Sequence, residues 1–286
     1  MENTILLSGF SDEISPDFET QLVTVQSLGL KHIEIRGVNG RNISEYTPQE
    51  AKTLQAAMDA HGIRVSSVGS PCGKIKITDD FAPHFEQFKN VVALAKEFGT
   101  RNIRMFSFLI PEGDNPAAHR DEVLRRLEKM VEYAVEQDVV LLHENEKEIY
   151  GDVATRCRDL FEQLGGDHFR GVFDFANFVQ CGQDTLEAYE MLAPHIAYIH
   201  IKDARLADGQ VVPAGMGDGH VSQLLGRFKD SGYRGFLSLE PHLQSFVGYH
   251  ALEAGAADKK EESDGTMPFT MATNALKSIL WDLNWR

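Results

Sequence analysis

The stretch AYIHIKD, residues 197–203, alternates apolar and polar side chains with a period of two, which is the pattern of a β-strand. On such a strand Tyr198, His200 and Lys202 share one face, and the two isoleucines share the other. A histidine and a lysine are costly to bury at the end of an otherwise apolar strand unless they have polar partners. The stretch therefore predicts a buried strand that brings polar groups to a site shared with other parts of the chain.

Three further strand-like stretches, LLHE, GVFD and FLSLE, end in Glu144, Asp174 and Glu240. Three ionised carboxylates cannot lie close together in apolar surroundings unless a cation or protons offset their charge. Together with His200 they offer three oxygen ligands and one nitrogen ligand. Such a set suits Mn²⁺, Mg²⁺, Co²⁺ or Zn²⁺ and leaves coordination positions open. We therefore predict one divalent metal ion per chain, bound by these four residues; the alternative for each residue alone is a polar group that merely ends its strand.

Short apolar strands and helical segments alternate eight times along the chain. This alternation predicts an α/β protein with a single (β/α)8 TIM barrel spanning residues 1–286. A doubly wound open sheet is the alternative, and it fits less well because the polar strand ends are spread over the whole chain. Two helix starts combine a capping residue with a following proline, at Ser15-Pro16 and Thr47-Pro48. The expected strands are 5–8, 33–36, 63–68, 102–108, 139–144, 169–174, 196–202 and 235–240, and the expected helices are 15–28, 47–61, 79–98, 116–137, 152–164, 184–192, 221–230 and 269–283.

The composition agrees with one large core, since the chain has 286 residues of which 42% are hydrophobic. Its net charge of −15 disfavours nucleic acid as a partner, because the phosphate backbone is also negative. The three widely spaced cysteines indicate free thiols in a reducing compartment. The sequence has neither a signal-peptide pattern nor an apolar run of ~20 residues. We therefore expect a cytoplasmic protein that does not bind membranes.

Two segments stand apart from the strand and helix pattern. Residues 245–268 carry many charges and little apolar periodicity, and we expect a solvated, mobile loop or a lid over the barrel mouth. Residues 215–219, GMGDG, precede a helix and are expected to form a tight turn. A phosphate could bind at such a helix start, but Asp218 argues against an anion there.

The order Glu, Asp, His, Glu on the fifth to eighth strands resembles the xylose isomerase-like barrels of the sugar phosphate isomerase/epimerase group. Further matching pieces are HIKD at 200–203, GMGDG at 215–219, LSLEPH at 237–242 and SDEISP at 11–16. The group includes ketose 3-epimerases, hydroxypyruvate isomerases, inosose dehydratases and endonuclease IV. The resemblance covers nearly the whole chain and is specific for the fold and the metal site, but it is weak for the substrate.

The resemblance implies a metal-dependent isomerase or epimerase of carbohydrate metabolism that acts on a ketose or related polyol. Glu144 and Glu240 would bind the metal and also move protons through a cis-enediolate, while Asp174 and His200 would be ligands only. The resemblance also implies a homo-oligomer.

Five further residues are candidates for substrate binding. Lys74 follows the third strand, and Asn177 follows the sixth strand shortly after its acidic end. For the other three a structural role is the open alternative. His242 lies two residues beyond the last ligand and could support it instead, Lys202 could pair with a neighbouring carboxylate, and Glu34 could join an ion-pair network inside the barrel with Arg36 and Arg104.

Three other functions compete with the isomerase interpretation. A keto-sugar or inosose dehydratase would start from the same enolate chemistry. A sugar-binding protein without a metal could use the same scaffold. Endonuclease IV is disfavoured, because this sequence has VGS at 68–70, MFS at 105–107 and Asn177 where that nuclease has its additional histidines.

Overall fold

Eight parallel strands form a nearly closed barrel in the computed structural model, which describes residues 5–243 and 264–285. Around the barrel they follow the order β1-β12-β9-β8-β7-β6-β5-β2, and all neighbouring pairs in this order are parallel. The predicted (β/α)8 TIM barrel is thus confirmed. The strands are β1 (Leu6–Gly9), β2 (His32–Ile35), β5 (Arg64–Gly69), β6 (Asn102–Met105), β7 (Val140–Glu144), β8 (Phe169–Asp174), β9 (Ile196–Ile201) and β12 (Phe236–Leu239).

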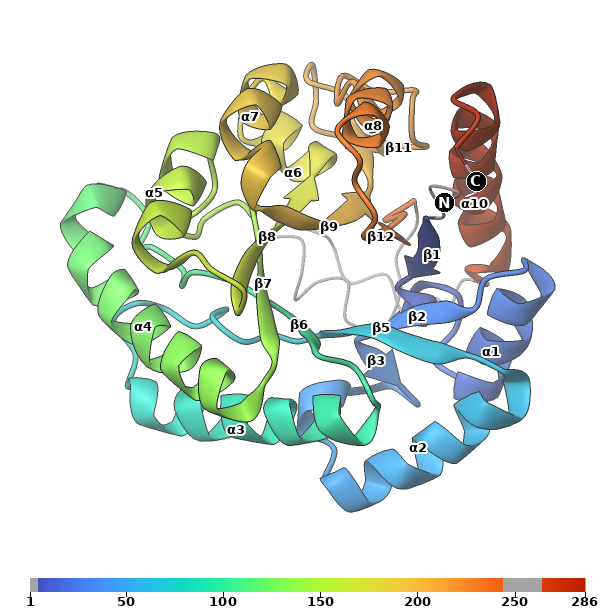
Figure 1. Ribbon diagram of the computed structural model, residues 1–286, viewed down its shortest axis with the longest axis horizontal. Coiled ribbons are helices and arrows are strands. Elements are labelled where there is room, and N and C mark those ends of the chain that lie inside the picture. The colour runs from blue at the N-terminus through green and yellow to red at the C-terminus, as the bar shows by residue number, and fades with distance from the viewer. Residues whose placement is uncertain (1–4, 244–263, 286) are drawn as a thin grey trace.

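The helices surround the barrel on its outer side (Figure 1). They bury their apolar faces against the strands, and the buried residues between the two layers form the main hydrophobic core. No helix of the described residues is long and apolar enough to cross a bilayer. The helices are α1 (Phe18–Ser27), α2 (Pro48–His61), α3 (Phe81–Glu97), α4 (Arg120–Gln137), α5 (Ala154–Leu164), α6 (Phe175–Gln180), α7 (Thr185–Leu192), α8 (Val221–Asp230) and α10 (Thr266–Asp282).

The parallel register brings the polar strand ends to one mouth. Asp174 of β8 is the direct neighbour of His200 on β9, and His200 is in turn paired with Ser238 on β12. Glu240 lies two residues beyond Ser238, and Glu144 ends β7 on the other side of β8. Four adjacent strands therefore present these side chains to a common centre.

The barrel is joined differently at its two end strands, β1 and β2. They lie beside each other but stand at opposite ends of the hydrogen-bonded order, so backbone pairing does not link them among the described residues. Hydrogen bonds between side chains cross the interior near this seam. The Ser8 and Ser66 hydroxyls lie 2.6 Å apart, and Ser238 donates to Glu34 at 2.8 Å.

Most predicted elements agree with the structure to within a few residues, but several details differ. The capping box at Thr47 and Glu50 is present. The first helix begins after Asp17 instead of Ser15, because the Asp17 carboxylate accepts from the Thr20 N–H, whereas the Ser15 hydroxyl accepts from the Asp17 N–H just before the helix. The fourth strand ends at Met105 and not at 108.

The short elements that were not predicted include α6 and two hairpins, β3 (Gly37–Val38) with β4 (Arg41–Asn42), and β10 (Asp203–Ala204) with β11 (Val211–Val212). The expected lid at 245–268 lies outside the described residues except for 264–268, of which 266–268 form the start of α10. The last helix therefore begins three residues earlier than expected.

Candidate metal centre

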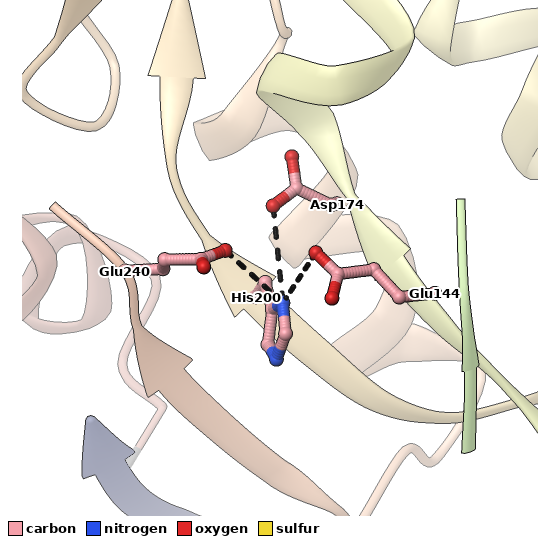
Figure 2. A group of neighbouring side chains, drawn as sticks. All are labelled: Glu144, Asp174, His200 and Glu240. Atoms are coloured by element: carbon pink, nitrogen blue, oxygen red, sulfur yellow. Dashed lines mark hydrogen bonds and ion pairs between the residues drawn. The ribbon is translucent and has the colours of Figure 1, made fainter. Parts of the chain in front are cut away.

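Glu144, Asp174, His200 and Glu240 converge at the mouth of the barrel, and all four are buried (Figure 2). His200 Nδ1 lies 3.1 Å from Glu144 Oε1, 3.3 Å from Glu240 Oε2 and 3.9 Å from Asp174 Oδ2. One ligand atom from each residue lies within 4.8 Å of all the others. Ligand atoms that share one cation at ~2.0–2.2 Å must be separated by distances of this size. The structure therefore brings the four predicted ligands together in a geometry that fits one divalent ion.

Each carboxylate turns one oxygen toward the imidazole and has its other oxygen held from outside. Glu144 Oε2 lies 3.3 Å from the Arg104 guanidinium. Asp174 Oδ1 accepts from the Asn177 backbone N–H at 2.8 Å, and Glu240 Oε1 accepts from Arg36 at 3.1 Å. The inward oxygen of Asp174 is buried and accepts no hydrogen bond among the described residues, although the Lys202 ammonium lies 3.2 Å from it. These three inward oxygens are thus the atoms that a cation would bind.

The imidazole of His200 is oriented by a fourth carboxylate. Its Nε2 lies 3.1 Å from Glu34 Oε2, which also accepts from the Ser238 hydroxyl. Because a carboxylate can only accept, Nε2 carries a proton, and by the same argument Nδ1 carries one toward Glu144 in the metal-free protein. A metal ion at Nδ1 would replace that second proton. A carboxylate behind a metal-binding histidine fixes the ring and raises its basicity.

Protons and nearby cations offset the carboxylate charges in this centre. Burial raises the pKa of Asp174 to about 7, although Lys202 acts in the opposite direction. Burial also opposes ionisation of Glu240, but Lys202 and His242 outweigh it and hold the pKa of Glu240 well below its usual range. For His200 burial favours the neutral ring, yet Glu144 and Glu34 raise its pKa well above the usual value.

The family described as xylose isomerase-like TIM barrel matches this chain over residues 22–262. The chain belongs to this family. The resemblance noted in the sequence is thereby confirmed.

Individual relatives within this fold carry different names. The 3-dehydroshikimate dehydratase of Bacillus anthracis is 23% identical over 189 residues, which are 63% of this chain and 64% of that protein, so the chain spans less than two thirds of this relative's length. The structure of L-ribulose 3-epimerase has a TM-score of 0.78 at 18% identity and covers 98% of this chain and 96% of its own. The IOLI protein, solved with a bound zinc atom, has a TM-score of 0.75 at 14% identity, with 98% and 99% covered. At these identities the structural likeness shows the fold.

The five residues expected to bind substrate differ in their positions relative to the four candidate ligands. Lys202 is buried against Asp174 and Glu240, and the Asn177 side chain donates to Glu144 Oε1 at 3.2 Å. The other three make different contacts. His242 Nε2 is 3.4 Å from Glu240 Oε1, Lys74 pairs with Glu146 at 3.1 Å, and Glu34 is completely buried behind the imidazole.

Sequence reasoning missed an acidic pair that follows β1. Asp12 and Glu13 both bind Arg36, at 2.8 and 3.2 Å, and Glu13 also accepts from the His242 backbone N–H at 2.7 Å. Burial raises the pKa of Glu13. The stretch SDEISP contains these residues, but only the fold shows that they meet Arg36 and His242. Arg36 therefore binds Asp12, Glu13 and Glu240, whereas Glu34 faces His200.

The segment 215–219 forms an anion-binding loop that is already filled by the protein itself. The backbone N–H groups of Gly215, Gly217 and Gly219 donate to the Asp203 carboxylate at 2.9 to 3.0 Å. Asp218, the residue expected to repel a phosphate, instead accepts from the Leu206 N–H. The Asp203 carboxylate thus takes the place that a phosphate would need.

A separate cavity of about 620 Å³ opens at the opposite end of the barrel, where the strands begin. It is lined in part by His32, Arg64 and Arg101 and is remote from the ligand carboxylates. Because catalytic side chains of this fold lie at the carboxyl ends of the strands, we place the functional site at the mouth.

Proposed function

We propose that this protein is a divalent-metal-dependent sugar isomerase or epimerase that acts on a ketose or related polyol. The proposal depends above all on the three inward carboxylate oxygens that face His200 Nδ1 at 3.1 to 3.9 Å. Membership of the family and the likeness to L-ribulose 3-epimerase support it. The IOLI protein, which shares this fold and was solved with a bound zinc atom, supports a metal in this protein.

Glu144, Asp174, His200 and Glu240 would hold the ion. Mixed carboxylate and imidazole ligands suit Mn²⁺, Mg²⁺, Co²⁺ or Zn²⁺. When bound, such an ion acts as a Lewis acid toward a substrate carbonyl and makes the adjacent C–H group more acidic. The buried Oδ2 of Asp174, which accepts no hydrogen bond among the described residues and has only the Lys202 ammonium at 3.2 Å as a close ion-pair partner, agrees with this assignment.

Glu144 and Glu240 are the candidates for proton transfer. They come from β7 and from the end of β12, which β8 and β9 separate, and in Figure 2 they approach the centre from opposite sides. One carboxylate would take the proton from the substrate carbon to give a cis-enediolate, and the other would return a proton to the opposite face or to the next carbon. Lys202 and His242 hold the pKa of Glu240 well below its usual range, so this carboxylate is ionised but weakly basic in the metal-free protein.

The remaining residues would support these groups or contact the substrate. We propose that Glu34 positions the His200 ring and that Asn177 positions Glu144, since each makes a hydrogen bond to that ligand. Lys74, Lys202 and His242 stay candidates for contact with substrate hydroxyl or carbonyl oxygens. Lys74 also lies over the Phe106 ring, at 4.7 Å from its centroid, which would hold its ammonium at the mouth.

The first experiment combines metal analysis with one conservative substitution. Wild type should retain about one divalent ion per chain after dialysis against Mn²⁺, and Glu240→Gln should remain folded but lose at least ~100-fold in epimerisation of a ketose panel. Glu128→Gln, on the exposed side of α4, is the matched control and should behave as wild type. Near-normal activity of Glu240→Gln would refute the proposed role of this residue. A protein that binds no ion under any condition would favour the metal-free sugar-binding protein instead.

A dehydratase is the second candidate, because a curated relative is named as 3-dehydroshikimate dehydratase. Both reactions begin with removal of a proton next to a carbonyl, but only one loses water. Incubation of the protein with the ketose panel and Mg²⁺ in D₂O, followed by NMR, distinguishes the two reactions. An epimerase gives an isomer that carries deuterium at the inverted carbon and has lost no water, whereas a dehydratase gives an unsaturated product.

A further inference from the structure

Lys202 forms ion pairs with two of the carboxylates that face His200. It directly follows β9, and its side chain is buried. The ammonium lies 3.1 Å from Glu240 Oε2 and 3.2 Å from Asp174 Oδ2. These are the two oxygens that these residues turn toward His200 Nδ1.

Two buried arginines, Arg36 and Arg104, bind the same group of carboxylates from outside. Arg104 contacts Glu144 through Oε2, and Arg36 contacts Glu240 through Oε1. Both oxygens point away from the imidazole. Among the lysines and arginines of residues 5–243 and 264–285, Lys202 is therefore the one whose ion pairs fall on inward oxygens. Its positive charge acts on the same atoms that a divalent ion would bind.

We propose that Lys202 is an internal counter-cation that stabilises the metal-free carboxylate cluster and weakens its affinity for divalent metal ions. The inference rests on the proposed metal centre. Like charges that share ligand oxygens at about 3 Å repel each other, and this repulsion is strong in a buried, weakly screened site. Removal of the lysine charge should therefore favour the ion and disfavour the metal-free protein.

The test is a calorimetric titration with Mn²⁺ at a fixed pH of 8 for all variants, together with thermal unfolding with and without the ion. Lys202→Met keeps the length of the side chain and removes its charge. We expect it to bind Mn²⁺ at least ~10-fold more tightly than wild type and to have a lower melting temperature without metal. Added Mn²⁺ should raise its melting temperature by more than that of wild type. Lys202→Arg retains the charge and should keep an affinity close to that of wild type.

Two further variants separate charge from packing and from general surface effects. Lys202→Gln retains hydrogen-bond donors without a charge, and it should also bind Mn²⁺ more tightly even if Lys202→Met fails to fold without metal. Lys74→Met removes another lysine of the mouth, whose partner Glu146 is not a metal ligand, and its Mn²⁺ affinity should equal that of wild type.

The outcomes distinguish this inference from the proposed function. If wild type binds one ion and both neutral variants bind it equally or more weakly, the role of Lys202 is refuted while the metal centre stands. If neither wild type nor the neutral variants bind an ion, the metal centre itself is refuted and the inference fails with it. Binding by the neutral variants alone would support the inference in its strongest form.

Discussion

Glu34→Gln tests whether the carboxylate behind His200 sets the metal affinity. Glu34 Oε2 lies 3.1 Å from His200 Nε2 and 2.8 Å from the Ser238 hydroxyl, and the side chain is fully buried. Glutamine has the same size but turns a charge-assisted hydrogen bond into a neutral one. Charge-assisted bonds contribute about 1.5–3 kcal/mol and neutral bonds about 0.5–1.5 kcal/mol. The difference of about 1–1.5 kcal/mol corresponds to a loss of roughly tenfold in affinity.

The affinity is measured by calorimetric titration with Mn²⁺, and activity is not needed as a readout. Glu146→Gln is the matched control, because Glu146 is a buried carboxylate of the same mouth that contacts Lys74 and no ligand residue. The control should bind Mn²⁺ like wild type, and Glu34→Gln should bind it about tenfold more weakly. An affinity of Glu34→Gln within twofold of wild type would refute the positioning role of this carboxylate.

Three further predictions concern stability. Burial lowers the pKa of His84 to about 4, so between pH 6.5 and 4 the unfolded chain takes up a proton that the folded protein resists. The free energy of unfolding should therefore fall by about 3 kcal/mol over this range. Urea unfolding of His84→Gln should show a smaller loss, and an equal loss would contradict this role of His84. Gly73→Ala should destabilise the fold by at least ~3 kcal/mol, seen as a lower melting temperature, because the residue has φ +81° and an added Cβ would lie 2.0 Å from the Phe106 carbonyl oxygen. Asp203→Asn should cost about 1.5–3 kcal/mol in urea unfolding, since the loop 215–219 would lose its charged acceptor; an unchanged midpoint would argue against this anchor.

The strand ends were predictable because periodicity and topology act together. Alternation marks which face of a strand is polar, and parallel strands bring their carboxyl ends to one mouth. These two rules are enough to predict from the sequence that Glu144, Asp174, His200 and Glu240 lie together. They do not depend on the exact strand boundaries, which differ from expectation by a few residues.

The contacts around the ligands were not predictable in the same way. Arg36 meets Asp12 and Glu13 across the seam and Glu240 across the mouth, and these pairs are fixed by loop conformations that carry no periodic signal. Glu34 was expected among the substrate-binding residues, but it lies behind the His200 ring. Its position depends on the register between β2 and its neighbours, which the sequence pattern does not reveal. The helix α6 was missed because six residues directly after a strand leave no room for a helical period or a separate capping signal.

The seam between β1 and β2 gives the barrel a preferred line of local opening. Backbone pairing holds the other strand neighbours together, whereas here the closure depends on side chains, with Arg36 linking the loop after β1 to Glu240. Separation of the two strands would also move Arg36 away from Glu240, the proposed proton-transfer residue. Amide hydrogen exchange of β1 and β2 should therefore slow when a metal ion or substrate binds at the mouth. Arg36 thus connects the seam of the barrel to the proposed site at its mouth.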